Sequence, residues 1–343
     1  MPYAFILGGN GQIGIATASH LLDHGWTVTI AHRGLRPVPA DLVRRGANVV
    51  TFDREQPGAL ARCLSSGADA LIDAVAYGPE HARQLLDAQS AVGSLIVVSS
   101  SSVYRDMKGR TLDEAAQNGF PELPVPVNET HPIVEPGPTT YSTRKAALER
   151  VLLDGATVPA TVLRPAAVSG VGSTHPREWW FVKRLIDGRE VIPLAYDGRS
   201  RFHTTSVANI AALVRLVASL RGQRILNIAD PEALSVAEIA AAIISRFDSS
   251  ADVVALSDEA LYPPSVGGTP WSVQRPFVLD VAAAASLGYQ PQTNYRKAVG
   301  PICSWLVQAA AGKDWRVLFP VLAAYPYDLF DYQVEDALLA RLR

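Results

Sequence analysis

Short hydrophobic runs alternate with amphipathic segments through the first half of the chain. The runs are rich in Val, Ile and Leu and do not alternate with polar residues, which is typical of strands buried on both faces. The predicted strands are residues 3–7, 27–31, 48–52, 70–74 and 94–99. The predicted helices between them are residues 12–24, 39–45, 58–65 and 80–91. This order predicts a parallel sheet with right-handed crossovers and helices on both faces.

The second half of the chain is less regular. Residues 105–140 form a long polar, Pro-rich stretch, and a loop of this length is usually functional. A helix is predicted from Tyr141 to Leu153, followed by a strand at 157–164 and by mixed segments up to about Leu287. Residues 305–343 have a helical pattern with several aromatic side chains, for which core or subunit contacts are favoured over a substrate role. We therefore predict an α/β fold, a doubly wound parallel sheet with a smaller C-terminal lobe.

Composition excludes several classes of protein. The 343 residues carry a formal net charge of −2, and 48% of them are hydrophobic, so a large core is expected and disorder is not. The charge gives no general attraction for nucleic acid or an anionic membrane. Cys63 and Cys303 fit a reducing compartment and exclude a disulfide framework. Because the N-terminus lacks a basic segment and no apolar run approaches about 18 residues, we expect a cytoplasmic protein without a membrane span.

A glycine-rich turn follows the first predicted strand and leads into a helical pattern. Gly8, Gly11 and Gly14 have the spacing GxxGxxG. Glycine lets the backbone approach a pyrophosphate, which the N–H groups and positive dipole end of the following helix can bind. A simple turn is the alternative, but the strand–turn–helix context favours a dinucleotide site. Residues 1–165 are therefore predicted to be a Rossmann domain, with core strands also from later segments, and residues 166–343 mostly a substrate-binding lobe with C-terminal helices.

The end of the second strand indicates which dinucleotide binds. NAD sites usually carry Asp or Glu there, about 20 residues after the glycines, to bind the ribose 2′-hydroxyl. This chain has His32 and Arg33 instead, with Arg36 nearby, and a guanidinium suits a 2′-phosphate. Ordinary surface basic residues are the alternative, and we predict NADP in preference to NAD. Asp53 ends the third strand, where it either bonds the adenine amino group or caps the next helix.

Two Tyr-x-x-x-Lys pairs occur in the chain. On a helix this spacing puts both side chains on one face, and the ammonium can lower the pKa of the phenol from about 10 toward the working pH. Tyr104 and Lys108 lie where a strand enters a loop, so they need not share a face. Tyr141 and Lys145 open a strong helix. The second pair is the predicted catalytic pair.

Four consecutive serines, residues 99–102, end the fifth predicted strand. Active sites of open α/β sheets gather at these strand ends. A hydroxyl there can hold a substrate carbonyl oxygen while the phenol supplies or removes its proton. Serines also end strands for no chemical reason, and that interpretation would prevail if the run stood alone.

These motifs together resemble the extended or atypical short-chain dehydrogenases/reductases, in the epimerase/dehydratase superfamily. The resemblance covers about residues 3–290 and rests on GGNGQIG at 8–14, SSSSVY at 99–104, YSTRK at 141–145 and LRPAAV at 163–168. It implies that Tyr141 is the acid/base and that Lys145 bonds the nicotinamide ribose. Alignment with the pattern Ser-x-x-Val-Tyr makes Ser100 the catalytic hydroxyl and gives Tyr104 a structural role. The segment PAAV would lie along the nicotinamide, and dimerisation through the helix that starts at Tyr141 is common in the family.

The predicted sites combine the motifs and the resemblance. The catalytic residues are Ser100, Tyr141 and Lys145. The cofactor-binding residues are Gly8, Gly11, Gln12, Ile13, Gly14, His32, Arg33, Asp53, Ala74, Tyr141, Lys145 and Pro165. Ser101 and Trp180 are candidate substrate contacts, although core packing is the favoured role of Trp180. The seven histidines show no metal-ligand spacing with Cys or acidic residues, so no metal is predicted.

Two departures from the family pattern restrict the reaction. Ser101 and Ser102 stand where dehydratases carry an Asp-Glu pair, so dehydration by that route is not expected. Nucleotide-sugar enzymes usually have an Arg-Asp pair before a Val-Asp-Asp segment, but residues 201–211 read RFHTTSVANIA, with the Arg displaced and both acids missing. The leading hypothesis is therefore an NADP-dependent oxidoreductase that transfers hydride between nicotinamide and a carbonyl or alcohol of a small organic substrate.

Two other hypotheses stay open. A nucleotide-sugar epimerase with retained NAD(P) needs the same three catalytic residues and differs in consuming no cofactor. A non-catalytic cofactor-sensing or RNA-binding protein is less favoured, because it has no need of a tuned phenol and because the near-neutral charge is unsuited to RNA.

Overall fold

The computed structural model describes residues 1–257, 262–263 and 265–342. The chain folds into two compact units. Unit 1 comprises Met1–Val168, Val207–Ala229 and Leu279–Gln292, and unit 2 comprises Ser169–Ser206, Asp230–Val278 and Thr293–Arg343. Two later segments of the chain thus complete the unit that begins at the N-terminus.

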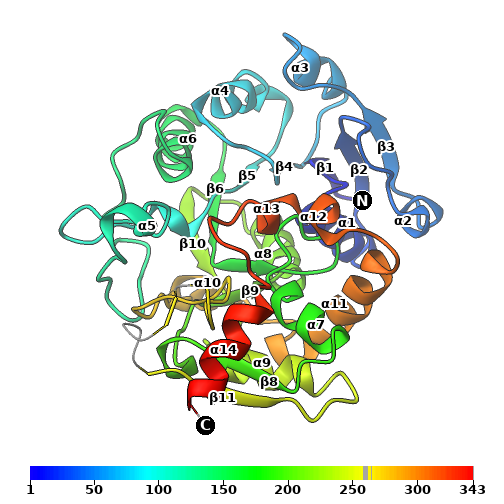
Figure 1. The fold of residues 1–343 in the computed structure, drawn as a ribbon. Coiled ribbons are helices and arrows are strands. Elements are labelled where there is room, and N and C mark those ends of the chain that lie inside the picture. The colour runs from blue at the N-terminus through cyan, green and yellow to red at the C-terminus, as the bar shows by residue number, and fades with distance from the viewer. Residues whose placement is uncertain (258–261, 264, 343) are drawn as a thin grey trace. The chain divides into compact units, whose positions relative to one another are not determined.

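Unit 1 is built on a seven-stranded sheet, and all of its neighbouring strands are parallel (Figure 1). In spatial order the strands are β10 (Arg224–Ile228), β6 (Ala160–Pro165), β5 (Leu95–Val98), β4 (Ala70–Asp73), β1 (Tyr3–Leu7), β2 (Thr27–His32) and β3 (Asn48–Thr51). The chain starts at β1, adds β2 and β3 on one side, and then crosses back to add β4 and its successors on the other. This confirms the predicted doubly wound sheet. Between β1 and β4 lies the topological switch point at which open α/β sheets bind their ligands.

Helices cover both faces of this sheet. The helical elements of unit 1 are α1 (Gln12–Asp23), α2 (Ala40–Arg44), α3 (Ala59–Cys63), α4 (Pro79–Asp87), η1 (Gln89–Ala91), η2 (Ser101–Val103), α5 (Ala115–Asn118), α6 (Tyr141–Gly155), α8 (Val207–Ser219) and α10 (Ala282–Ser286).

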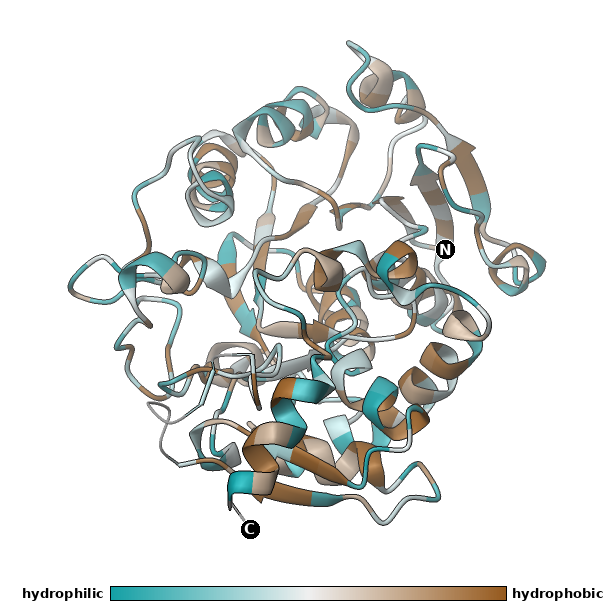
Figure 2. Ribbon diagram, viewed as in Figure 1, coloured by the Kyte–Doolittle hydropathy of each residue, from teal (hydrophilic) through white to brown (hydrophobic). Residues whose placement is uncertain are grey.

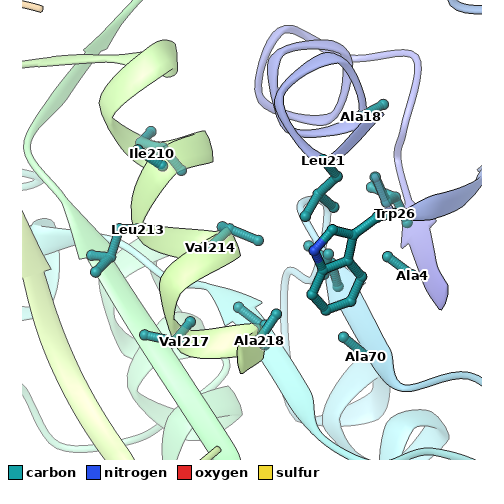
Figure 3. Close-up of a cluster of buried hydrophobic side chains, with 14 of the residues drawn as sticks. Ala4, Ala18, Leu21, Trp26, Ala70, Ile210, Leu213, Val214, Val217 and Ala218 are labelled. Carbon is teal, nitrogen blue, oxygen red and sulfur yellow. The ribbon is translucent and has the colours of Figure 1, made fainter. Parts of the chain in front are cut away.

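Successive residues of β1 enter two different hydrophobic cores. Ala4 and Ile6 pack in a core with side chains of α1 and α8, whereas Phe5 and Leu7 pack in a second core with side chains of α4 and α6. Figure 3 shows the first core, with the Trp26 ring between side chains of α1 and α8. Because both faces of the strand are buried, its sequence has no polar alternation, which is the pattern that predicted it.

The predicted elements of unit 1 are present, with ends that differ by a few residues. β6 starts at Ala160 rather than at residue 157, and the helix predicted at 80–91 divides into α4 and η1 at Ala88. The stretch at 105–140 is mostly irregular, but the Asp106 carboxylate holds it together. That carboxylate accepts the backbone N–H groups of Lys108, Arg110 and Glu122 and the guanidinium of Arg110. Burial alone would raise the pKa of Asp106, but these hydrogen bonds lower it to about 2.

Unit 2 combines a short parallel strand pair with packed helices. Its elements are α7 (Trp179–Ile186), β8 (Val191–Leu194), η3 (Tyr196–Gly198), β9 (Thr204–Ser206), α9 (Val236–Ile244), β11 (Asp252–Ala255), α11 (Tyr295–Ala310), α12 (Trp315–Leu318), α13 (Pro320–Ala323) and α14 (Tyr332–Leu342), and β7 (Ala167–Ser169) lies at the boundary between the units. β8 pairs with β11. The aromatic residues of the C-terminal segment pack inside this unit, and Phe319 contacts both Trp179 and Trp305 at centroid distances of 5.4 and 6.1 Å.

The predicted helical tail at 305–343 is correct in type but not in extent. Helix α11 already begins at Tyr295, because the side chain of Asn294 caps it by accepting the N–H of Lys297. The tail then divides into separate helices after Gly312, which has a φ of 66°, and at Pro320, which opens α13.

Helix α14 carries both hydrophobic and hydrophilic positions, visible as brown and teal turns in Figure 2, and its Leu338 packs with residues of the β11 region. Across the described residues, every helix is too short or too polar to cross a membrane.

Candidate active site

The glycine-rich turn between β1 and α1 is closely packed. The N–H groups of Gly8 and Gly9 both donate to the carbonyl oxygen of Ala31, at 3.0 and 3.2 Å. Gly8 has a φ of 72°, and a Cβ on Gly14 would lie 2.4 Å from the Gly8 carbonyl oxygen. Gly11 caps α1 without a side chain, which leaves the positive end of the helix open to an anionic group. This tight cradle fits a pyrophosphate.

Two predicted cofactor residues carry polar atoms that the protein itself does not pair. One is the Oε1 atom of Gln12, which lies beside Ile13 in the first turn of α1, and the other is the Nε2 atom of His32 at the end of β2. Both atoms are enclosed and have no hydrogen-bond partner among the described residues. The Nδ1 atom of His32 accepts the N–H of Gly34 at 2.9 Å, so Nε2 carries the ring proton and needs an acceptor. Enclosed polar atoms normally have partners, so a bound molecule fits both positions. Arg33 follows β2 directly and is exposed.

Three other predicted cofactor residues lie at or just after the carboxyl ends of β3, β4 and β6, which belong to the same sheet. Ala74 follows β4 directly, and Pro165 ends β6. Asp53 follows β3, and its carboxylate accepts the backbone N–H of Glu55 at 3.1 Å. The N-cap residue of α3 is Gly58, so the helix-cap alternative for Asp53 is wrong.

The first turn of α6 is fixed from two sides. The Thr140 hydroxyl, in the N-cap position, accepts the backbone N–H of Thr143 at 3.2 Å. The carboxylate of Asp113, from the long loop, accepts the N–H of Ser142 at 3.1 Å. Both contacts satisfy N–H groups that a helix start leaves unpaired, and the carboxylate is favourable at the positive end of the dipole. Tyr141, the first residue of α6, is thereby held in a defined position.

Ser100, Tyr141 and Lys145 come together at the carboxyl ends of β4 and β5. The Ser100 hydroxyl donates to the Ser102 hydroxyl at 2.9 Å and is near enough to the Tyr141 phenol to lower its pKa. One turn further along α6, the Lys145 ammonium donates to the carbonyl oxygens of Ala76 and Val98 at 2.6 and 3.0 Å. Ala76 lies in the loop after β4, and Val98 is the last residue of β5. The structure therefore brings together the three residues that the sequence predicts.

The pKa of Tyr141 differs from the sequence prediction. Burial raises the pKa of this phenol, Ser100 lowers it, and Tyr77 and Asp113 raise it further, so that the net shift is upward. Lys145 does not lower the pKa of this phenol, because the pKa of Lys145 is itself lowered to about 8 and the ammonium has lost its charge at the pH where the phenol ionises. Ser100 is thus the group in unit 1 that favours the phenolate.

The Lys145 ammonium is enclosed in unit 1, with 6% of the residue exposed. Burial lowers the pKa of Lys145 to about 8, and the carboxylates of Asp73 and Glu149 oppose this shift. The ammonium can therefore lose its proton within a pH range that an activity assay can reach.

A buried polar network continues along the same face of α6. Glu149, one turn beyond Lys145, pairs with Arg164 of β6 at 2.5 Å and accepts the Ser99 hydroxyl at 2.5 Å. Arg164 donates to the Tyr104 hydroxyl at 3.1 Å, and that hydroxyl donates to Asn227 at 2.7 Å. Tyr104 therefore has the structural role that the resemblance implies.

Sequence reasoning missed one aromatic residue beside the Tyr141 phenol. The Tyr77 ring is 41% exposed and lies 5.6 Å from the Tyr141 ring, between centroids. The Arg144 guanidinium covers Tyr77 at 4.4 Å and pairs with Glu80 at 2.8 Å. The available signal was the place of Tyr77 shortly after a predicted strand, at the edge where active sites form.

The two candidate substrate contacts are both buried. Ser101 lies in η2 with 3% of its surface exposed. Trp180 lies in α7 of unit 2 and is completely buried, with Phe181 at a centroid distance of 4.8 Å and the Arg184 guanidinium 3.5 Å from its ring centre. These contacts are those of a packed core residue, and the indole Nε1 of Trp180 is enclosed without a hydrogen-bond partner among the described residues.

Comparison with known proteins identifies a protein family and a relative of known activity, each of which matches the larger part of this chain. Residues 4–229 match the family model described as "NAD dependent epimerase/dehydratase family". A dTDP-L-rhamnose 4-epimerase from Burkholderia thailandensis is 28% identical over 264 residues, which cover 72% of this chain and 69% of that protein.

Solved structures of similar fold cover nearly the full chain. A dTDP-glucose 4,6-dehydratase from Bacillus anthracis in complex with NAD has a TM-score of 0.67 and 15% identity, covering 93% of this chain and 100% of that one. A UDP-N-acetylglucosamine 4-epimerase from Methanobrevibacter ruminantium in complex with UDP-N-acetylmuramic acid has a TM-score of 0.67 and 17% identity, covering 90% and 99%. At these identities the likeness shows that the fold is shared.

Proposed function

This chain belongs to the NAD-dependent epimerase/dehydratase family of enzymes, and from that premise we propose that it is a nucleotide-sugar epimerase with a retained nicotinamide dinucleotide. The similarity to a dTDP-L-rhamnose 4-epimerase favours this activity over net reduction of a small carbonyl compound. The observation that carries the proposal is the placement of Ser100 and of the buried Lys145 beside the Tyr141 phenol. Because the family's Arg is displaced in this chain and both acids are missing, we infer that this enzyme holds its substrate partly with other groups.

The three catalytic residues divide the proton chemistry between them. Tyr141 takes the proton of the sugar hydroxyl as the carbon is oxidised, and it returns this proton when the carbon is reduced from the other face. Ser100 donates a hydrogen bond to the same oxygen, and it favours the deprotonated form in which Tyr141 starts and ends the reaction. Lys145 supplies positive charge, and with Ala76 and Val98 as acceptors it retains one N–H for a bound molecule. A bound nicotinamide ring supplies the acceptor and donor of the hydride.

The cofactor would be held by the glycine turn, the first turn of α1 and the end of β2. The close approach at Gly14 and the unpaired atoms of Gln12 and His32 support this placement. We propose NADP as the preferred form, because Arg33 and Arg36 occupy the exposed segment where an NAD site usually has a carboxylate.

Cofactor titration tests the preference. We expect NADP to bind more tightly than NAD, and Arg33→Gln to weaken NADP binding about 10-fold or more while NAD binding stays unchanged. Arg44→Gln, at the end of α2, is the matched control and should change neither constant. Equal affinity for both dinucleotides, or an equal loss of both in Arg33→Gln, would show that Arg33 does not bind a 2′-phosphate.

Replacement of the catalytic phenol tests the reaction itself. Tyr141→Phe removes the proton carrier but keeps the ring, so turnover should fall by at least about 100-fold while cofactor affinity stays nearly unchanged. Conversion of dTDP-L-rhamnose to its 4-epimer, followed by proton NMR, gives the turnover. An unchanged rate in Tyr141→Phe contradicts the assignment.

Absorbance of the reduced cofactor separates the epimerase from a net reductase. During epimerisation we expect a dinucleotide that stays bound and no net change in NADPH over many turnovers. Steady consumption of NADPH with a carbonyl substrate would instead restore the reductase hypothesis.

A homodimer through α6 is proposed from the family resemblance alone. Sedimentation velocity of the full chain should give the mass of a dimer, and Arg150→Glu on the exposed side of α6 should reduce it. A monomer mass for the unaltered chain would exclude this assembly.

A further inference from the structure

A buried ion pair lies beside the loop that holds Lys145. The Arg54 guanidinium, from the segment after β3, donates to the carboxylate of Asp73, the last residue of β4, at 2.7 Å. The two side chains are 8% and 0% exposed. The Nε atom of Arg54 also donates to the side chain of Gln84 in α4 at 2.9 Å, and the Gln84 amide donates to the Arg54 carbonyl oxygen at 3.2 Å. Three segments of unit 1 thus meet at this pair.

Stability alone is a weak explanation for such a pair. The cost of removing two charges from water offsets most of their attraction inside a protein. Apolar side chains of similar volume would fill the same space without that cost. The groups around Arg54 and Asp73 therefore have to show what the pair does.

The Asp73 carboxylate fixes backbone that binds the Lys145 ammonium. Its Oδ1 atom accepts the backbone N–H of Val75 at 3.0 Å. The carbonyl oxygen of the next residue, Ala76, accepts the ammonium at 2.6 Å. The second acceptor is the carbonyl oxygen of Val98, at 3.0 Å, and Val98 ends β5, the strand that pairs with β4. Asp73 therefore adjoins the backbone of both acceptors.

The charge of Asp73 also acts on Lys145. Burial lowers the pKa of Lys145 to about 8, whereas the carboxylates of Asp73 and Glu149 oppose this shift. Glu149 belongs to the same helix as Lys145 and pairs with Arg164. The titratable phenol of Tyr141, also in α6, has its ring centre 5.6 Å from the ammonium. Asp73 thus supplies negative charge from β4, and Arg54 is the cation that partly balances it.

We propose that Arg54 and Asp73 form a positioning pair for Lys145. Asp73 fixes the loop carbonyl that accepts the ammonium and places negative charge beside it, and Arg54 holds the Asp73 carboxylate in place. The pair thereby keeps Lys145 charged and oriented, with one N–H left for a bound molecule. This inference rests on the proposed function, in which Lys145 supplies positive charge, and it assigns a role to two residues that act through Lys145 rather than on the substrate.

Lysine NMR of the full chain, without substrate, tests the pair. The chain has five lysines, so carbon-13 labelling at the lysine ε position follows the titration of each, and Lys145→Met assigns the signal of Lys145. We expect a midpoint near pH 8 in the unaltered chain. Asp73→Asn keeps the shape and an acceptor for Val75 but removes the charge, so the midpoint should fall by about half a pH unit or more. Arg54→Met leaves the Asp73 charge unbalanced, so the midpoint should rise.

Two further variants separate this role from a merely structural one. Asp106→Asn is the matched control, because Asp106 is also buried, pairs with an arginine and accepts backbone N–H groups, but lies in the long loop. It should leave the Lys145 midpoint unchanged. The double variant Arg54→Met/Asp73→Asn leaves no unpaired charge, so it decides the question if Asp73→Asn does not fold. Its midpoint should also lie below that of the unaltered chain.

Three results would overturn the proposal. The first is an unchanged Lys145 midpoint in Asp73→Asn or, if that variant does not fold, in the double variant. The second is an equal fall in Asp106→Asn, which would reduce the effect to a general loosening of unit 1. The third is a midpoint that does not rise in Arg54→Met. The titration needs neither substrate nor turnover, so the inference and the proposed function fail separately.

Discussion

Replacement of Glu149 by Gln perturbs the buried polar network that lies one turn of α6 beyond Lys145. The two side chains have nearly the same shape, so the change is mainly one of charge and hydrogen bonding. The Oε1 atom of Glu149 accepts the Ser99 hydroxyl and the Nε of Arg164, and its Oε2 atom accepts the terminal guanidinium nitrogen. Both oxygens therefore face donors. In either orientation, Glu149→Gln directs its NH₂ group at one of these donors and removes the charge that balances Arg164.

The magnitude follows from burial. The side chains of Arg164 and Glu149 are 2% and 3% exposed, and loss of one partner of such a pair costs about 3–5 kcal/mol. Glu80→Gln is the matched control, because Glu80 also pairs with an arginine of α6, Arg144. That pair has side chains that are 44% and 36% exposed, and a surface pair contributes less than about 1 kcal/mol. The two variants have the same chemistry and differ in burial.

Hydrogen exchange followed by mass spectrometry measures the effect where it occurs, since a chain with two units need not unfold in one transition. Peptides from β6 and α6 should exchange about 100- to 4,000-fold faster in Glu149→Gln, because each 1.4 kcal/mol is about tenfold, and no more than about fivefold faster in Glu80→Gln. The double variant Glu149→Leu/Arg164→Met should recover most of the loss, because it leaves no unpaired charge. Equal effects of Glu149→Gln and Glu80→Gln would refute the assumption that burial sets the cost.

Two further outcomes follow from the site. Gly14→Ala places a Cβ 2.4 Å from the carbonyl oxygen of Gly8, so dinucleotide binding measured by calorimetry should be lost. The control Gly300→Ala, whose Cβ would have its nearest neighbour at 3.8 Å, should bind the dinucleotide normally. Normal binding in both variants would contradict the close approach at Gly14. The folded-state pKa of Lys145 is about 8 against the ordinary lysine value of 10.5, so turnover should fall as the pH rises through 8, and Lys145→Met should lack this limb of the pH profile. The unfolded chain holds the Lys145 proton up to a higher pH, so the contribution of this residue to stability should rise with pH between these values, and urea titrations across that range check the sign.

The elements that local pattern determines are those that the sequence predicts well. The unalternating run at β1 identifies a strand buried on both faces, and the spacing of Gly8, Gly11 and Gly14 identifies the turn after it. Tyr141 and Lys145 stand one helical turn apart, so the helix alone places them on a common face. Each of these inferences depends on residues close together in the chain.

Hydrogen bonds and ion pairs between segments far apart in the chain could not be predicted from the sequence. The partners of Lys145 are backbone carbonyls of residues 76 and 98, and a carbonyl has no side-chain signature. Glu149 and Arg164 meet only because α6 packs against the sheet. Asp53 had two open roles, and only the observed start of α3 at Ala59 removed one of them.

The pKa of Tyr141 shows why residue type and spacing do not decide chemistry alone. The pattern Tyr-x-x-x-Lys predicts an ammonium that favours the phenolate, but burial lowers the pKa of Lys145 to about 8, so this group loses its charge before a phenol of raised pKa ionises. In unit 1 two backbone carbonyls hold the Lys145 ammonium in place, and they reduce its freedom to turn toward the phenol. Ser100 is the side chain that lowers the pKa of Tyr141 instead. Activation of the phenol should therefore depend more on that hydroxyl, and Ser100→Ala should move the ascending limb of the pH profile, on which Tyr141 loses its proton, to higher pH, whereas an unmoved limb would return the tuning role to Lys145.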